Sequence, residues 1–179
     1  MNTDQEFAEK YSMYMYRQGI PKRYHKKPLS AYGPVGTYLK GIFSDKETWE
    51  TYFKNKPILN LVNKEGIREQ ELLFAVARTF LIYNQKVVVK RLQDLILASD
   101  NDFADWLQNK VICINNFYHS QIENFISPGH QYTIEDFVVN CVMEDKILII
   151  SSDATLDKFD WYSKKNNSFM REYGEDLLL

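Results

Sequence analysis

The stretch Ile58-Leu59-Asn60-Leu61-Val62 is an apolar run of strand length, interrupted only by one amide side chain. Pairs of apolar residues follow it at helical spacing over residues 72–81. Three further strand patterns lie over 86–92, which contains the run Val87-Val88-Val89, over 111–114 and over 147–150, and they alternate with helical patterns over 94–107 and 134–143. Strands that are apolar throughout and alternate with helices of ten or more residues predict a mainly parallel sheet with helices on both faces.

The N-terminal third of the chain has a different pattern. Residues 4–18 carry aromatic and methionine side chains at helical spacing, and Gly19 is expected to end that helix. Residues 20–41 are rich in Pro, Gly and Tyr, which predicts a segment that wraps over a surface without long elements. Ser44 followed by Glu47 matches a capping box that opens the next helix. We therefore expect an N-terminal helix and wrapping segment over 1–43 and a core domain over 44–179.

Composition fits one soluble globular unit with an uneven charge distribution. The 179 residues are 45% hydrophobic, and the formal net charge is −2. Residues 1–60 carry ten Lys or Arg against six Asp or Glu, a balance of +4, so the remainder carries −6. The run Lys22-Arg23-Tyr24-His25-Lys26-Lys27 lies at the centre of the basic part. Either a solvated turn or a phosphate-contacting patch fits this run.

Two cysteines and three histidines give no metal or disulfide pattern. Cys113 and Cys141 each lie among apolar residues, where a small buried thiol fits. The acidic start of the chain lacks an apolar signal core, and no stretch approaches the length of a membrane span. We expect a cytoplasmic protein with neither a metal site nor a membrane partner.

The order of the predicted elements and several local phrases resemble the DnaC/IstB-type helicase-loader ATPases, a bacterial AAA+ family. The phrase Gly19-Ile20-Pro21-Lys22-Arg23-Tyr24 looks like the lead-in to the ATPase core of that family. Residues 58–62 match its first core strand, 63–70 its phosphate loop and 72–83 the helix behind that loop. The similarity spans roughly residues 19–175 and implies a three-layer P-loop domain of the AAA+/RecA-like type.

The phosphate-loop position departs from the family's Walker A motif. That motif needs glycines for close approach to phosphate, a Lys for the β and γ oxygens and a hydroxyl for Mg²⁺. In this sequence Gly66 is the one matching glycine, Arg68 stands at another glycine position, Glu69 replaces the Lys, and Gln70 replaces the hydroxyl. The resemblance therefore implies a degenerate loop, although Lys64 and Arg68 could still attract an anion.

The other nucleotide-binding motifs of the family also lack their functional residues in this sequence. Walker B requires an acidic pair after the third strand, and Asn115 and Asn116 stand there instead. The phrase Ser151-Ser152-Asp153 occupies the position of the family's polar sensor, with Ser152 and Asp153 as the sensor-like residues. At the place of its trans-acting arginine stands Phe169, with Arg171 two residues later on another helix face. The resemblance thus predicts no catalytic residues and no nucleotide cofactor.

These observations lead to a non-catalytic interaction protein of DNA replication, which binds a replicative helicase, a helicase loader or a copy of itself. Such a protein would suit a phage or mobile element. The alternative is a single-stranded nucleic-acid-binding module that uses segment 17–38, with tyrosines 24, 32 and 38 stacking on bases beside Lys22, Arg23, Lys26 and Lys27. Those tyrosines could equally pack on the domain beneath. An unrelated α/β domain, or an enzyme of another class, is the remaining alternative.

Overall fold

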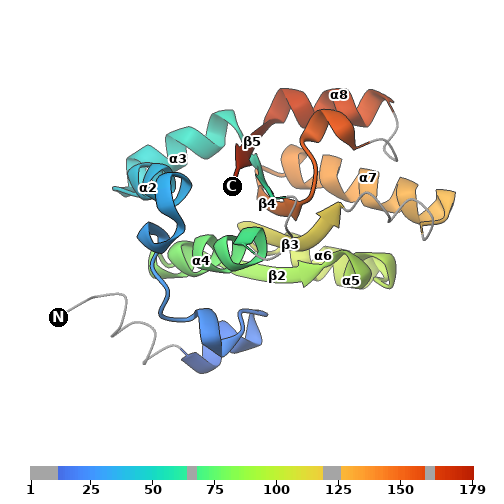
Figure 1. Cartoon of the computed structure of the whole chain (residues 1–179). Helices are drawn as coiled ribbons and strands as arrows, with labels where there is room; N and C mark the ends of the chain where they lie inside the picture. The colour runs from blue at the N-terminus through green and yellow to red at the C-terminus, as the bar shows by residue number, and fades with distance from the viewer. Residues whose placement is uncertain (1–11, 64–67, 119–125, 160–163) are drawn as a thin grey trace.

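The computed structural model of the chain describes residues 12–63, 68–118, 126–159 and 164–179. Helices and strands alternate over most of these ranges (Figure 1). The strands are β1 (Ile58–Val62), β2 (Val87–Arg91), β3 (Val111–Tyr118), β4 (Ile147–Ser152) and β5 (Gly174–Leu178). The α-helices are α2 (Gly33–Ile42), α3 (Lys46–Asn55), α4 (Arg68–Ile82), α5 (Leu92–Ile96), α6 (Asp100–Leu107), α7 (Pro128–Met143) and α8 (Lys164–Tyr173). Short 3-10 turns are η1 (Lys22–Tyr24), η2 (Leu29–Tyr32) and η4 (Leu156–Lys158).

The five strands form one sheet in the order β2-β3-β4-β1-β5, and every pairing is parallel. Leu148 of β4 lies beside Ile58 of β1 on one side and Ile112 of β3 on the other. The four apolar runs predicted from the sequence are therefore neighbouring strands, and the predicted parallel α/β fold is confirmed.

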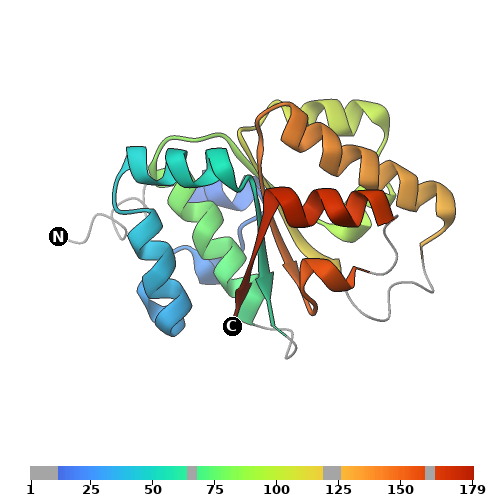
Figure 2. The same cartoon turned by 90° about the horizontal axis from the view of Figure 1, so that it is seen from above.

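Successive strand residues bury their side chains in two separate cores, one on each face of the sheet. Ile58 and Leu148 belong to a core formed with α5 to α8, whereas their neighbours Leu59 and Ile149 belong to a core formed with α2 to α4. Figure 2 shows these two groups of helices on opposite sides of the strands. Burial on both faces explains why the strands are apolar throughout and do not alternate with polar residues.

The N-terminal segment is anchored to the edge strand β2 and to helix α4. Residues 12–17 are helical, and Gly19, at φ 90°, ends that helix as predicted. The backbone N–H of Val89 donates to the carbonyl of Gln18 at 3.0 Å, and a Cβ on Gly19 would lie 2.7 Å from the carbonyl oxygen of Val89. Glycine is therefore needed at position 19 both for its backbone conformation and for this close approach.

Three sequence expectations about local structure are wrong. Segment 20–41 was expected to lack long elements, but Gly33–Ile42 form helix α2, with Pro34 in its first turn where a missing N–H has no cost. Asp45, and not Ser44, caps α3 by accepting from the N–H of Thr48 at 2.8 Å. The edge strand β5 was not predicted at all, because its charged residues break the apolar pattern.

Candidate functional site at the carboxyl edge of the sheet

The residues that the sequence places at the two Walker positions come together at the carboxyl edge of the sheet. Helix α4 begins soon after β1 ends, and β3 and β4 end beside them. In open parallel sheets, ligands bind at this edge, where neighbouring strands connect in opposite directions. Gly66 and the side chain of Arg68 lie outside the described residues.

A direct hydrogen bond joins the two motif positions. Nε2 of Gln70, in the first turn of α4, donates to Oδ1 of Asn116 near the end of β3 at 2.8 Å. In the resemblance, these positions would hold a hydroxyl and a carboxylate that share a Mg²⁺ ion. Here one amide satisfies the other, and neither brings the negative charge that Mg²⁺ prefers in its protein ligands.

Asn116 is held in an unusual backbone conformation, with φ at 55°. Its N–H donates to Oγ of Ser151 at 2.9 Å, and that hydroxyl donates to Oδ1 of the buried Asn115 at 3.0 Å. The register of β3 against β4 shifts between Ile114 and Tyr118, and Asn115 and Asn116 lie within this irregular part of the strand. Ser151 thus connects both asparagines to β4 through one hydroxyl.

Ser152, chosen from the sequence as sensor-like, faces away from this cluster. Its hydroxyl lies 2.7 Å from Oδ1 of Asn60 and 2.6 Å from the carbonyl of Ala154, either of which can accept its proton. Because adjacent strand residues point to opposite faces, the residue that contacts Asn115 is Ser151. Ser151, one position before Ser152, is therefore the serine that joins the Asn115 and Asn116 cluster.

Glu69 carries a carboxylate into the position where the resemblance expects a lysine. Its side chain is only 3% exposed, and within the described ranges Oε2 has no hydrogen-bond partner. Burial raises the pKa of Glu69, and the nearby charge of Asp153 raises it further, whereas a hydrogen bond with the Asn63 side chain acts in the opposite direction. In its ionised form, this carboxylate would oppose a phosphate at a helix start, where phosphates are otherwise favoured.

The place of the trans-acting arginine lies on α8. Ser168 and Arg171 are exposed there, and the Phe169 ring packs on Tyr173 with their centroids 4.6 Å apart. A ring packed within its own helix supplies no guanidinium to a neighbouring molecule. Phe169, which stands where the resemblance expects the arginine, therefore makes an apolar contact within α8.

The basic segment divides into a buried and an exposed part. Tyr24 is 7% exposed and stacks on Phe74 with a centroid distance of 5.0 Å, so its ring packs on the domain and is not open to a base. Lys27 forms an ion pair with Glu71 in the first turn of α4. Lys22, Arg23 and Lys26 have exposed side chains.

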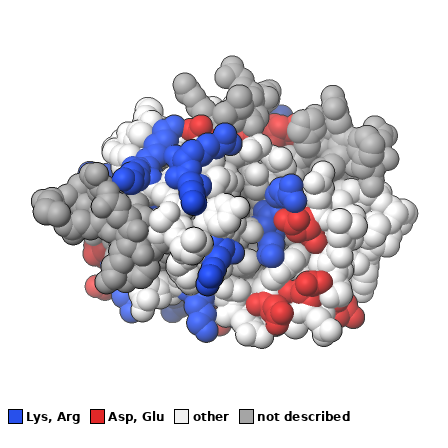
Figure 3. Space-filling model, turned by 90° about the horizontal axis from the view of Figure 1, so that it is seen from below, with Lys and Arg blue, Asp and Glu red and all other residues white. Residues whose placement is uncertain are grey.

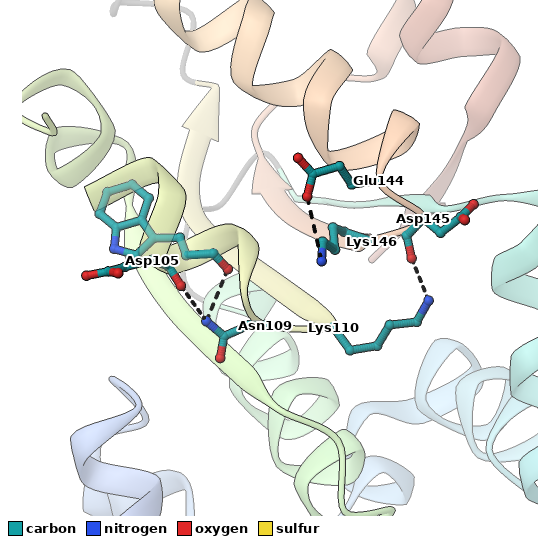
Figure 4. Close-up of polar contacts among 7 residues, drawn as sticks. Asp105, Asn109, Lys110, Glu144, Asp145 and Lys146 are labelled. Carbon is teal, nitrogen blue, oxygen red and sulfur yellow. Dashed lines mark hydrogen bonds and ion pairs between the residues drawn. The ribbon is translucent and has the colours of Figure 1, made fainter. Parts of the chain in front are cut away.

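A hollow of about 440 Å³ lies at the opposite, amino edge of the sheet, and two of its lysines, Lys110 and Lys146, contact residues just after α7. Nζ of Lys110 donates to the carbonyl of Asp145 just after α7, and Nζ of Lys146 lies 3.8 Å from Glu144 (Figure 4). Asn109 caps α6 by donating to the carbonyls of Asp105 and Trp106. The lysines thus place positive charge near the carboxyl end of α7, and Asn109 satisfies carbonyl groups at the carboxyl end of α6.

The sheet order and the position of the site define a P-loop-type α/β domain. Comparison with solved structures gives the same fold. The crystal structure of the DnaC helicase loader matches with a TM-score of 0.66 and 15% identity, over 89% of this chain and 99% of that one. The crystal structure of DnaI matches with a TM-score of 0.67 and 10% identity, over 90% and 95% of the two chains.

A replication initiator has the same core. DnaA bound to AMPPCP and single-stranded DNA matches with a TM-score of 0.67 and 11% identity, over 89% of this chain. The chain spans 50% of the length of that structure. No protein-family model matches the sequence, and no curated protein matches it. The solved structures confirm the fold that the resemblance predicts, at sequence identities of 10–15%.

No helix in the described parts of the chain has both the length and the apolar character that a membrane crossing requires. In the same parts, no three His, Cys, Asp or Glu side chains converge in the way metal ligands do.

Proposed function

We propose that this protein acts in DNA replication through contacts with a replicative helicase or a helicase loader, without binding or hydrolysing ATP. The observation that carries the proposal is the hydrogen bond between Gln70 and Asn116, because the resemblance expects ligands of a nucleotide-bound Mg²⁺ at these two positions and here the two side chains bond each other. The loader-like fold supports the choice of process, because the DnaC and DnaI structures share it over almost their full length.

Glu69 also disfavours ATP binding, because it carries a negative charge where the resemblance expects a lysine. Two unit charges about 4 Å apart interact by roughly 4 kcal/mol at the effective dielectric of a protein surface, so a carboxylate here opposes phosphate on the order of several kcal/mol. Oε2 of Glu69 is buried, which lessens its screening by water. The fold is retained, because amides replace carboxylates of similar size and form their own hydrogen bonds.

The N-terminal helix offers a surface for a protein partner. Met15 is fully buried and anchors this helix, whereas Met13 is 60% exposed and Tyr14 is 42% exposed. Exposed apolar side chains that lie together commonly mark protein interfaces. A partner that covers Met13 and Tyr14 would bury them without disturbing the anchor.

Calorimetry with ATP and Mg²⁺ tests the nucleotide half of the proposal. The full chain should give no heat of binding at micromolar concentrations, and a tight, Mg²⁺-dependent signal would overturn this half. The variant Glu69→Lys serves as a probe of the cause. Binding that appears only in that variant would assign the lost affinity to the reversed charge.

Pull-downs with a replicative helicase and with a helicase loader from the same cell test the partner half. The full chain should capture one of them, and ATP should not change the amount captured. Met13→Ser with Tyr14→Ser should reduce capture, whereas Leu97→Ser, a change at an 84% exposed apolar residue elsewhere, should not. Capture of neither protein by the full chain would refute the proposed role.

A further inference from the structure

The N-terminal segment presents a basic and aromatic surface, named here the N-terminal face. Its members are the exposed side chains Tyr16, Arg17, Lys22, Arg23 and Lys26. No acidic residue occurs in the sequence from position 12 to position 44. On the side of the molecule that Figure 3 shows, Lys and Arg side chains gather in one region, and many of the acidic side chains lie in another.

Cations and rings alternate on this face. Nζ of Lys22 lies 6.0 Å from the ring centroid of Tyr16, and the Arg23 guanidinium lies 4.7 Å from the centroid of the Tyr24 ring. The ring of Tyr16 is 57% exposed, so it retains surface for another flat group. Positive charge beside an open aromatic ring is the combination that binds the phosphates and bases of a single strand.

Buried contacts hold the face in one conformation. Nε2–H of His25 donates to the carbonyl of Ile20 at 2.8 Å, which leaves Nδ1 to accept from the Ser12 hydroxyl at 3.1 Å. Nη1 of Arg78, on α4, donates to the carbonyl of His25 at 2.8 Å. These bonds tie the helical residues 12–17 to η1 and to the domain. A face ordered before binding loses less conformational entropy when a ligand arrives.

We infer that the N-terminal face binds single-stranded nucleic acid, with the phosphates near its four cations and a base stacked on Tyr16. This activity goes beyond the proposed protein contacts and does not depend on them. The inferred binding surface differs from the one expected from the sequence. Tyr24 is buried, whereas Tyr16, which lies outside segment 17–38, is exposed. A single strand fits better than a duplex, because only an unstacked base can cover the Tyr16 ring.

Fluorescence anisotropy with labelled oligothymidylate at increasing salt tests this inference. Release of counterions from a single strand gives a slope of log affinity against log salt of about −0.7 per phosphate, so four contacts predict about −3. Changing Arg17, Lys22, Arg23 and Lys26 to Ala should weaken binding and bring the slope towards zero. Tyr16→Ala should weaken binding about tenfold at an unchanged slope, because it removes stacking without removing charge.

A matched control removes the same charge elsewhere. Lys40, Lys46, Lys54 and Lys158 are exposed, and changing all four to Ala should leave the affinity and the slope as in the parent chain. Absence of binding by the parent, or equal loss in the control, would overturn the inference. So would competition by duplex DNA or by polyglutamate as strong as that by unlabelled oligothymidylate, since either result would mean attraction of any polyanion. Circular dichroism verifies that each variant is folded.

Discussion

Gln70 and Asn116, which are 46 residues apart in the sequence, meet through one hydrogen bond of 2.8 Å between their side-chain amides. The bond connects the first turn of α4 to the end of β3 across the carboxyl edge of the sheet. Two side chains at the family's metal-binding positions therefore act as a contact between elements.

Replacing Asn116 by alanine should destabilise the protein more than replacing it by glycine. A residue with a Cβ costs about 1–2 kcal/mol in the left-handed region, which asparagine tolerates better than most and glycine occupies freely. Asn116→Ala should lower the free energy of unfolding in urea by about 1–2 kcal/mol. Asn116→Gly loses the same hydrogen bond without the strain, so an equal loss in both variants would contradict this explanation.

Glu69→Gln should stabilise the protein at neutral pH. The folded state raises the pKa of Glu69, so the folded state binds a proton more readily than the unfolded state and is penalised when the group is ionised. The penalty is fully present above the folded pKa and disappears as pH falls below the unfolded value. Urea unfolding at a series of pH values should show the advantage of the variant at pH 7 shrinking towards acid.

Asp102 provides a control of opposite sign. Its carboxylate accepts from the Ser99 hydroxyl at 2.6 Å and the Ser99 N–H at 2.8 Å, and these bonds lower its pKa in the folded state. The stabilisation is present above the unfolded pKa and is lost as pH falls through the folded one. Asp102→Asn should therefore destabilise at pH 7, with a difference that vanishes in acid. The same pH trend in both variants would show that the assigned signs are wrong.

Asn60 should be among the least replaceable polar residues of the sheet. Its Nδ2 donates to Oδ1 of Asp176 at 2.7 Å and to the carbonyl of Ala154 at 3.0 Å, in the middle of β1. Burial raises the pKa of Asp176, and the bond from Asn60 opposes that rise. Asn60→Ala removes two hydrogen bonds, one of them to a carboxylate, and should cost about 2–4 kcal/mol in urea unfolding. A cost below about 1 kcal/mol, the net value of an ordinary hydrogen bond, would refute this role.

His25 should hold the N-terminal segment on the domain. His25→Ala removes both ring contacts of a side chain that is 3% exposed, and the loss should be about 1–3 kcal/mol. Trypsin should then cleave after Lys22 and Arg23 faster than in the parent chain. Lys26→Ala, next to it and exposed, should change neither stability nor the rate of cleavage at those two residues.

The sequence was sufficient for the centre of the fold, because residues buried on both faces leave uninterrupted apolar runs such as 58–62. It was not sufficient for β5, where the partly buried Glu175 and Asp176 interrupt the apolar pattern. Asp176 lies there because it bonds the Asn60 side chain and the Leu156 N–H, partners far away in sequence. Such partners leave no local pattern.

The site was predicted in part. Spacing placed Gln70 and Asn116 at two motif positions, but only the structure shows that they contact each other. Spacing did not separate Ser151 from Ser152, because the choice depends on which face of β4 each residue occupies. Nor did it show that Tyr24 is buried by stacking on Phe74, since that contact depends on how the N-terminal segment crosses α4.

The hydrogen bond from Val89 to Gln18 occupies part of the sheet edge at which another molecule could pair. β2 is an edge strand, and an open edge can recruit a strand from another chain. The N-terminal segment occupies that edge at Val89, with Gly19 allowing the close approach. Any side chain at position 19 would push the segment outward and free the Val89 amide. Gly19 thus lets the segment cover part of the β2 edge, which is then less open to a strand of another molecule.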